Sequence, residues 1–185
     1  MYKSGHRGIN MLLFSPIFFI MIIFEYIIIG ILSVIVITYF ASIPDIDLKC
    51  RFLTHRGFTH TYSFGIFIGM IFSIIGLFVL MVFINMGIVA PSILTIIGVS
   101  VWGFFVGLFI VLSHVIGDII TPAGVRPFQK PRYIPNSPIF SDKKYTLDLI
   151  RASNKIANFS LLIVGTASIS ISFFTGIYLL YVIPI

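Results

Sequence analysis

The sequence predicts an all-α integral membrane protein, a single domain over residues 1–185 built as a bundle of about five transmembrane helices. Hydrophobic residues make up 58% of the 185-residue chain and charged residues only 10%, whereas soluble domains carry about 25% charged residues. The apolar residues also form runs long enough to cross a bilayer, separated by short polar connectors. With a mean hydropathy of +1.12, lipid rather than water must cover most of the surface.

The first apolar run extends from Ile9 to Ile43 and is interrupted only by Glu25. One straight helix over this run would be about 52 Å long, whereas the hydrocarbon core of a bilayer is about 30 Å thick. The run therefore predicts a hairpin of two short spans, 9–24 and 26–43, that turns at Glu25.

Three longer apolar runs predict the remaining spans, which are 59–84, 93–120 and 156–182. The last two are separated by a long loop, 121–155. Because proline is repeated in the first part of this loop, it cannot form one continuous helix. The weak amphipathic pattern of residues 141–155 is compatible with a short interfacial helix.

All twelve Lys and Arg residues fall on one side of the predicted bundle. With five spans, the N-terminus, the connector 44–58 and the loop 121–155 share that side. The positive-inside rule makes it cytoplasmic, in a multi-pass protein of the cell membrane whose C-terminus lies outside. Topology and contact with anionic headgroups account for the net charge of +6, so no nucleic-acid partner is predicted.

The histidines and three aspartates fall on this same predicted face, although the positive-inside rule depends only on Lys and Arg. His114 and Asp118 are spaced i, i+4 on the fourth predicted helix, so both side chains lie on one helical face and can hold a metal ion. The alternative is a buried hydrogen bond between helices. An ionisable residue inside a span is costly, however, and is by default a candidate functional residue.

Polar residues between the second and third spans add further candidates. Asp45 and Asp47 supply oxygen ligands, unless they are solvated acids at a helix-ending turn. Thr59 could cap the third helix, which would leave His60 in a first turn whose free N–H groups favour an anion. Arg56 adds a bidentate donor for phosphate or carboxylate. The alternative for this segment is ordinary interfacial polarity.

The mixture of imidazole and carboxylate groups suits zinc best, with manganese or iron as alternatives. The candidates exceed one tetrahedral shell, so one or two divalent ions are expected, with some residues orienting ligands instead. The predicted metal ligands are His6, Asp45, Asp47, His60, His114 and Asp118. His6 is the weakest of them, because a histidine in a basic N-terminal tail is usually solvated.

The order of these motifs resembles the YdjM-like family of membrane-bound, bacterial inner-membrane proteins described as metal-dependent hydrolases. The resemblance covers most of the chain and rests on His6, Pro44-Asp45-Ile46-Asp47, His55-Arg56-Gly57-Phe58-Thr59-His60-Thr61, and His114-x-x-x-Asp118-x-x-Thr121-x-x-Gly124 followed by Pro127. More remotely, the chain is similar to zinc-dependent phospholipase C, which implies zinc ligands at His6, Asp47, His60, His114 and Asp118. The later His-x-x-x-Glu element of that enzyme has no counterpart here, which argues against a complete three-zinc cluster.

The sequence therefore favours a membrane-embedded, metal-dependent hydrolase, a phosphoesterase acting on a lipid or lipid-linked substrate at the cytoplasmic leaflet. His55 is expected to be a ligand, a general base or a partner of a ligand, and Thr121 to orient Asp118. Arg56 and Arg126 are expected to bind the anionic group of the substrate. The proline-rich loop would cover the site.

Two other classes of protein remain open. A transporter or channel could use the same residues as an ion or proton relay, although the spans are almost purely apolar beyond the charged edge. A non-catalytic membrane scaffold could hold a structural metal in a saturated shell. The sequence carries no signal for an oligomeric state.

Overall fold

The computed structural model describes residues 1–50, 52, 55–129 and 141–182. Within these residues the secondary structure is helical, and its elements in chain order are α1 (Lys3–Ile23), α2 (Ile27–Tyr39), the 3₁₀ helices η1 (Pro44–Leu48) and η2 (Phe58–His60), α3 (Tyr62–Asn85), α4 (Ile93–Ile119) and α5 (Lys155–Val182). Five segments are long and apolar enough to cross a membrane, the second being α2 together with η1. The prediction of an all-α bundle with five spans is confirmed.

The predicted hairpin of the first two spans is present, and its turn lies at Glu25. This residue has a left-handed backbone conformation, with φ 64°, between the end of α1 and the start of α2. The first span begins earlier than predicted, at Lys3 instead of residue 9. The apolar run marks only the part of a helix that faces lipid, and no proline in residues 3–8 stops α1 from continuing into the polar edge. This extension carries His6.

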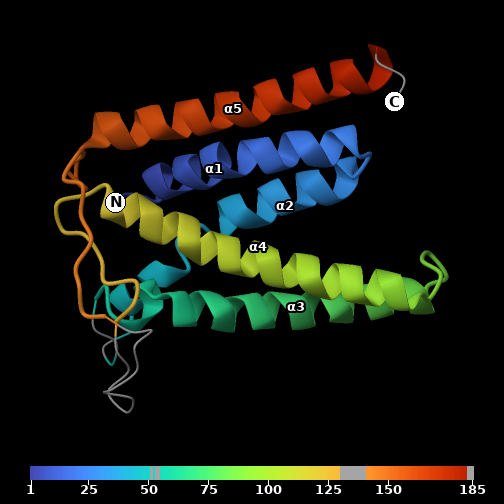
Figure 1. The fold of residues 1–185 in the computed structure, drawn as a ribbon, viewed down its shortest axis with the longest axis horizontal. Coiled ribbons are helices and arrows are strands. Elements are labelled where there is room, and N and C mark those ends of the chain that lie inside the picture. Colours follow the sequence, from blue (N-terminus) through green and yellow to red (C-terminus); the bar gives the residue numbers. More distant parts are fainter. Residues whose placement is uncertain (51, 53–54, 130–140, 183–185) are drawn as a thin grey trace.

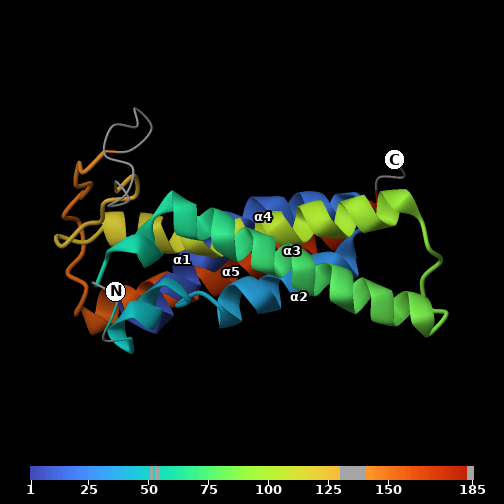
Figure 2. The ribbon, with the colours of Figure 1, turned by 90° about the horizontal axis from the view of Figure 1, so that it is seen from below.

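The helices form a bundle in which α1 lies between α5 and the hairpin partner α2 (Figure 1), and α4 packs against α3, α1 and α2. Figures 1 and 2 agree in placing the N-terminus, η1, η2 and the segment after α4 at one end of the bundle. The C-terminal end of α5 and the α3–α4 turn lie at the other end. We call the first of these the loop end.

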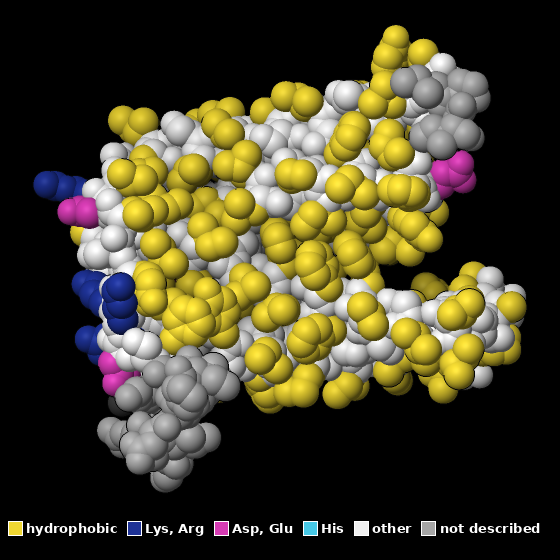
Figure 3. All heavy atoms as spheres, viewed as in Figure 1, with side chains coloured by type: hydrophobic (Ala, Val, Ile, Leu, Met, Phe, Trp, Pro, Cys, Tyr) yellow, Lys and Arg dark blue, Asp and Glu magenta, His cyan; other side chains and the backbone are white. Residues whose placement is uncertain are grey.

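The surface matches this membrane-spanning arrangement. Hydrophobic side chains cover the length of the helices, and Lys and Arg side chains gather at the loop end (Figure 3). The interior contains a cluster of buried side chains from three helices, including Phe14 and Ile22 of α1, Ile37 of α2 and Ile110 of α4. The charge asymmetry predicted from the sequence is therefore a property of the folded bundle.

Small residues and one buried amide hold α5 against α1. A Cβ atom added to Gly165 of α5 would overlap the backbone of Gly8 in α1, and one added to Gly8 would overlap the backbone at Leu161. Close backbone approach through small residues is the usual way in which membrane helices associate. At the loop end, the side chain of Asn158 accepts a hydrogen bond from the Tyr2 N–H at 3.0 Å. These contacts fix the first turns of α1.

The loop before α5 differs from the prediction, because residues 141–154 form no interfacial helix. Val125 and Tyr145 instead form an isolated antiparallel bridge. The N–H groups of Leu147 and Leu149 donate to the carbonyls of Ile119 and Ile120. Carbonyls at the end of a helix need donors, and the extended segment supplies them to α4. Pro131, Pro135 and Pro138, part of the loop expected to cover the site, lie outside the described residues.

Candidate metal centre

Five of the predicted metal ligands meet at the loop end, although they come from four separate elements. They are His6 of α1, Asp45 of η1, His60 of η2, and His114 and Asp118 of α4. The three imidazoles and Asp118 are buried. The ligand atoms of His6, His114 and Asp118 lie within 4.8 Å of one another, as do those of Asp45, His60 and His114.

The distances among four of these groups match a metal coordination shell. The Nε2 atom of His60 lies 3.2 Å from Asp118 Oδ2 and 3.8 Å from Asp45 Oδ1. The Nε2 atom of His114 lies 3.7 Å and 3.5 Å from the same two oxygens. In a tetrahedral zinc site with bonds of about 2.0–2.2 Å, neighbouring ligand atoms are about 3.3–3.6 Å apart. The four imidazole–carboxylate distances are therefore close to those expected between ligands of one ion.

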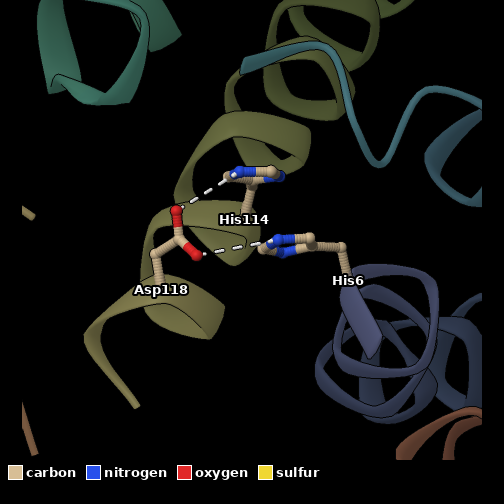
Figure 4. A group of neighbouring side chains, drawn as sticks. All are labelled: His6, His114 and Asp118. Atoms are coloured by element: carbon tan, nitrogen blue, oxygen red, sulfur yellow. Dashed lines mark ion pairs between the residues drawn. The ribbon is translucent and has the colours of Figure 1, made fainter. Parts of the chain in front are cut away.

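His6 approaches the same group from α1. Figure 4 shows its ring parallel to the ring of His114, with both rings turned toward the carboxylate of Asp118. The Nε2 atom of His6 lies 3.7 Å from Asp118 Oδ1. The chain makes room for this ring at Gly117, where a Cβ atom would lie 3.0 Å from His6 Nδ1.

The hydrogen bonding of the imidazoles tests whether a metal ion fits here. The Nε2 atoms of His6, His60 and His114 are buried, and none has a hydrogen-bond partner among the described residues. Buried polar atoms without a partner are rare and costly, because they lose their bonds to water. Three such nitrogens that face two carboxylates are the donor set that zinc, manganese or iron requires. The residues therefore fit a divalent ion.

The tautomer of His114 follows from its other ring nitrogen. His114 Nδ1 lies 2.8 Å from the carbonyl oxygen of Ala41, and a carbonyl can only accept a hydrogen bond. The proton of a neutral imidazole must then be on Nδ1, which leaves a lone pair on Nε2. Such a bond from the outer nitrogen is the usual support of a metal-binding histidine.

His60 is supported in the same way by a chain of hydrogen bonds. Thr59 Oγ1 donates to Asp47 Oδ2 at 3.0 Å and lies 3.0 Å from His60 Nδ1. Because the hydroxyl hydrogen is used for Asp47, its oxygen can accept the Nδ1–H of His60, which directs the Nε2 lone pair inward. Thr59 is not the helix cap expected from the sequence. That role belongs to Thr61, whose side chain accepts the N–H of Phe64, so α3 starts after His60.

Asp47 lies behind His60 and belongs to neither of the two groups of potential ligands. Its Oδ2 atom accepts the Arg56 N–H at 2.8 Å, and its Oδ1 atom lies 3.2 Å from His55 Nδ1. The structure thus separates the two aspartates of η1. Asp45 faces the imidazoles of His60 and His114, whereas Asp47 braces the connector between η1 and η2.

Arg56 joins this connector to α4. Its guanidinium donates to the carbonyl of Gly124 at 2.9 Å and to Asp118 Oδ1 at 3.3 Å. Its backbone is left-handed, with φ 60°, a conformation that non-glycine residues adopt at a cost and often at functional sites. The hydroxyl of Thr121 donates to the backbone carbonyl of Asp118 at 2.8 Å rather than to its carboxylate. Thr121 therefore holds the last turn of α4.

A pocket of about 310 Å³ opens beside Arg56. His55 and Arg126 line it, and both side chains are exposed. Of the predicted catalytic and substrate-binding residues, His55, Arg56 and Arg126 thus line this pocket. Thr121 does not line it and contacts the backbone of Asp118 instead.

Comparison with known proteins places the chain in a family. A family model described as YdjM inner membrane protein matches residues 23–183. The chain belongs to this family. Membership and the five apolar helices together identify a multi-pass membrane protein of the inner-membrane type. The match includes every candidate site residue except His6. No curated protein and no solved structure matches the chain, and the similarity to zinc-dependent phospholipase C stays an expectation.

Two parts of the site carry no signal in the sequence. The carbonyl of Ala41, which fixes the tautomer of His114, is a backbone group of an apolar segment. Lys144 reaches the pocket only because residues 141–149 fold back along the end of α4. The role of Thr59 had a partial signal, since its hydroxyl is adjacent to His60 in the sequence.

Proposed function

We propose that this protein is a metal-dependent hydrolase of the inner membrane, a phosphoesterase that acts on a lipid or lipid-linked substrate at the cytoplasmic leaflet. One observation carries the proposal. Three buried Nε2 atoms, which have no hydrogen-bond partner in the described part of the chain, face the carboxylates of Asp45 and Asp118. The charged pocket supports a hydrolytic role, because it can hold an anionic substrate beside Arg56, which contacts Asp118.

The arrangement favours one metal ion over two. Both groups of potential ligands include His114, whose Nδ1 atom is engaged with Ala41. Only its Nε2 lone pair remains, and one lone pair binds one ion. His60, His114, Asp45 and Asp118 would hold the ion, with His6 as a fifth ligand. Zinc suits these nitrogen and oxygen donors best, and manganese or iron would also be accepted.

The bound ion would lower the pKa of a water molecule and polarise a phosphoryl oxygen. The protein would supply the remaining functions from the pocket. If His55 donates its Nδ1–H to Asp47, its Nε2 atom would be the one that takes or gives a proton. Arg56 and Arg126 would bind the anionic group. Arg56 would also hold Asp118 in place through its 3.3 Å contact.

The distribution of ionisable groups disfavours a transporter. Apart from Glu25 and the tyrosines of the helices, the ionisable side chains in the described residues lie at the loop end. A relay across the bilayer needs such groups at several depths. The candidate site is instead confined to the loop end, which suits an enzyme that acts at one face of the membrane.

The test is the metal content of the detergent-purified protein, measured by plasma mass spectrometry, together with hydrolysis of phospholipids and lipid phosphates. We expect about one equivalent of zinc, manganese or iron and metal-dependent hydrolysis. His114→Ala and Asp118→Ala should lose both. Ser113→Ala is the matched control, because Ser113 is buried beside His114 but bonds only to carbonyls of its own helix.

Each of the other outcomes would favour a different class of function. Full hydrolysis in folded His114→Ala and Asp118→Ala variants would overturn the proposal. Bound metal without any hydrolysis would favour a structural ion in a scaffold. Ion flux in proteoliposomes that His114→Ala abolishes would favour a transporter.

A further inference from the structure

The pocket beside Arg56 contains a third cation that the sequence did not indicate. Lys144 lines it together with Arg56 and Arg126, and the remaining polar side chains of the lining are His55 and Gln129. None of the described residues that line this pocket is acidic. We call these three cations with their pocket the cationic pocket.

The antiparallel bridge explains why Lys144 lies in the cationic pocket. Because Val125 pairs with Tyr145, continuing this register brings Arg126 and Lys144 next to each other, and both line the pocket. Like charges at directly opposed positions of an antiparallel pair destabilise the pairing. Gly124, with a left-handed φ of 57°, turns the chain into this bridge, and its carbonyl binds Arg56. The fold therefore brings three positive charges together at a cost.

A bound anion would remove that cost. The number of unpaired cations in the pocket indicates the charge that this anion would carry. Arg56 is paired with Asp118. Among the described residues, which include every Asp and Glu of the chain, no carboxylate lies within ion-pair distance of Arg126 or Lys144. Two positive charges are thus left uncompensated, which matches a dianion better than a singly charged group.

We propose that the cationic pocket binds a phosphate dianion, the terminal group of a phosphomonoester, and that Lys144 is a specificity residue for it. A phosphodiester carries only one negative charge at this group, so the pocket selects monoesters. That this phosphomonoester is the substrate rests on the proposed hydrolase function. The binding itself needs only the side chains of the pocket.

The test is the binding of inorganic phosphate to the full chain in detergent, measured by titration calorimetry after treatment with a chelator. We expect Lys144→Ala to weaken binding by about tenfold, the effect of losing one charged hydrogen bond. Lys143→Ala is the matched control. This lysine has the same charge one residue away, but it lies over the ring of Tyr145 and does not line the pocket. Equal binding by both variants, or no binding by the wild type, would overturn the proposal.

Competition with bound phosphate then tests whether the ligand is a monoester or a diester, and whether it is a lipid or a soluble molecule. Phosphatidic acid in nanodiscs should displace phosphate, whereas phosphatidylglycerol, a diester, should not. Equal displacement by the two lipids would overturn the selectivity for a dianion. Glycerol phosphate that competes as well as phosphatidic acid would support the proposal with a soluble monoester as the source. Because the protein is metal-free in these measurements, their outcome does not depend on whether the protein catalyses hydrolysis.

Discussion

The imidazole rings of His6 and His114 lie face to face, with centroids 3.7 Å apart and planes within 8° of each other (Figure 4). Two protonated imidazoles would repel each other strongly at this distance in a buried site. The stacked rings are therefore compatible with the neutral form, which is the form that binds metal. Gly117 permits the contact, because it leaves space for the ring of His6 one turn below His114 on α4.

Gly117→Ala should displace His6 and weaken metal binding. The new Cβ atom would lie 3.0 Å from His6 Nδ1 and 3.1 Å from Ile9 Cδ1, so the ring of His6 must shift from its place beside Asp118. We expect the affinity for zinc, measured by competition with a chromophoric chelator, to fall by about tenfold or more. Gly98→Ala on the same helix is the control, since a Cβ atom there meets nothing within 4 Å. Equal affinities in the two variants would show that His6 does not contribute to the site.

Asp45 and Asp47 should respond differently to removal of their charge. Asp45→Asn removes the negative charge of the carboxylate that faces His60 and His114, so the purified protein should lose its metal. Asp47→Asn weakens the bonds to Thr59 and Arg56 but leaves the ligand atoms in place. It should retain metal with an affinity about 10–100-fold lower. Metal content and chelator competition measure the two effects, and the opposite ranking would mean that Asp47 is the ligand.

The fold was largely predictable because the length and polarity of apolar runs decide whether a segment can cross a bilayer. Glu25 marked the hairpin turn, and the positions of Lys and Arg marked the loop end. The start of α1 was not predictable, since apolar residues show where lipid begins and not where a helix begins. His6 consequently looked like a residue of a solvated tail, whereas it is buried against His114.

The candidate site was predictable in its membership but not in its internal arrangement. His114 and Asp118 follow from helical spacing, and their convergence with Asp45 and His60 follows from topology. The difference between Asp45 and Asp47 depends on the tight 3₁₀ turn of η1, which points the two carboxylates to opposite sides of His60. Lys144 depends on a bridge between residues far apart in the chain, for which no local pattern exists.

Gly165→Ala should loosen α5 from α1 and destabilise the bundle. The added methyl group would overlap the carbonyl of Gly8, and a helix backbone cannot yield as a flexible side chain can. We expect a loss of stability of about 1–3 kcal/mol, measured by unfolding in mixed micelles of increasing dodecyl sulfate content. Gly98→Ala serves again as the control, because its helical propensity change is the same and its surroundings are open. If both variants gained stability, the close approach of α1 and α5 would not be needed.

The orientation of the bundle can be tested with Cys50, the single cysteine of the chain. It is partly exposed and lies after η1 at the loop end, which the positive-inside rule places in the cytoplasm. A membrane-impermeant maleimide should therefore leave Cys50 unlabelled in intact spheroplasts and label it in inverted vesicles. The control is Ala90→Cys in a Cys50→Ser background, because Ala90 is exposed in the α3–α4 turn at the opposite end and should show the reverse pattern. Labelling of Cys50 in spheroplasts would place the candidate metal centre, and any substrate it acts on, on the outer side of the membrane.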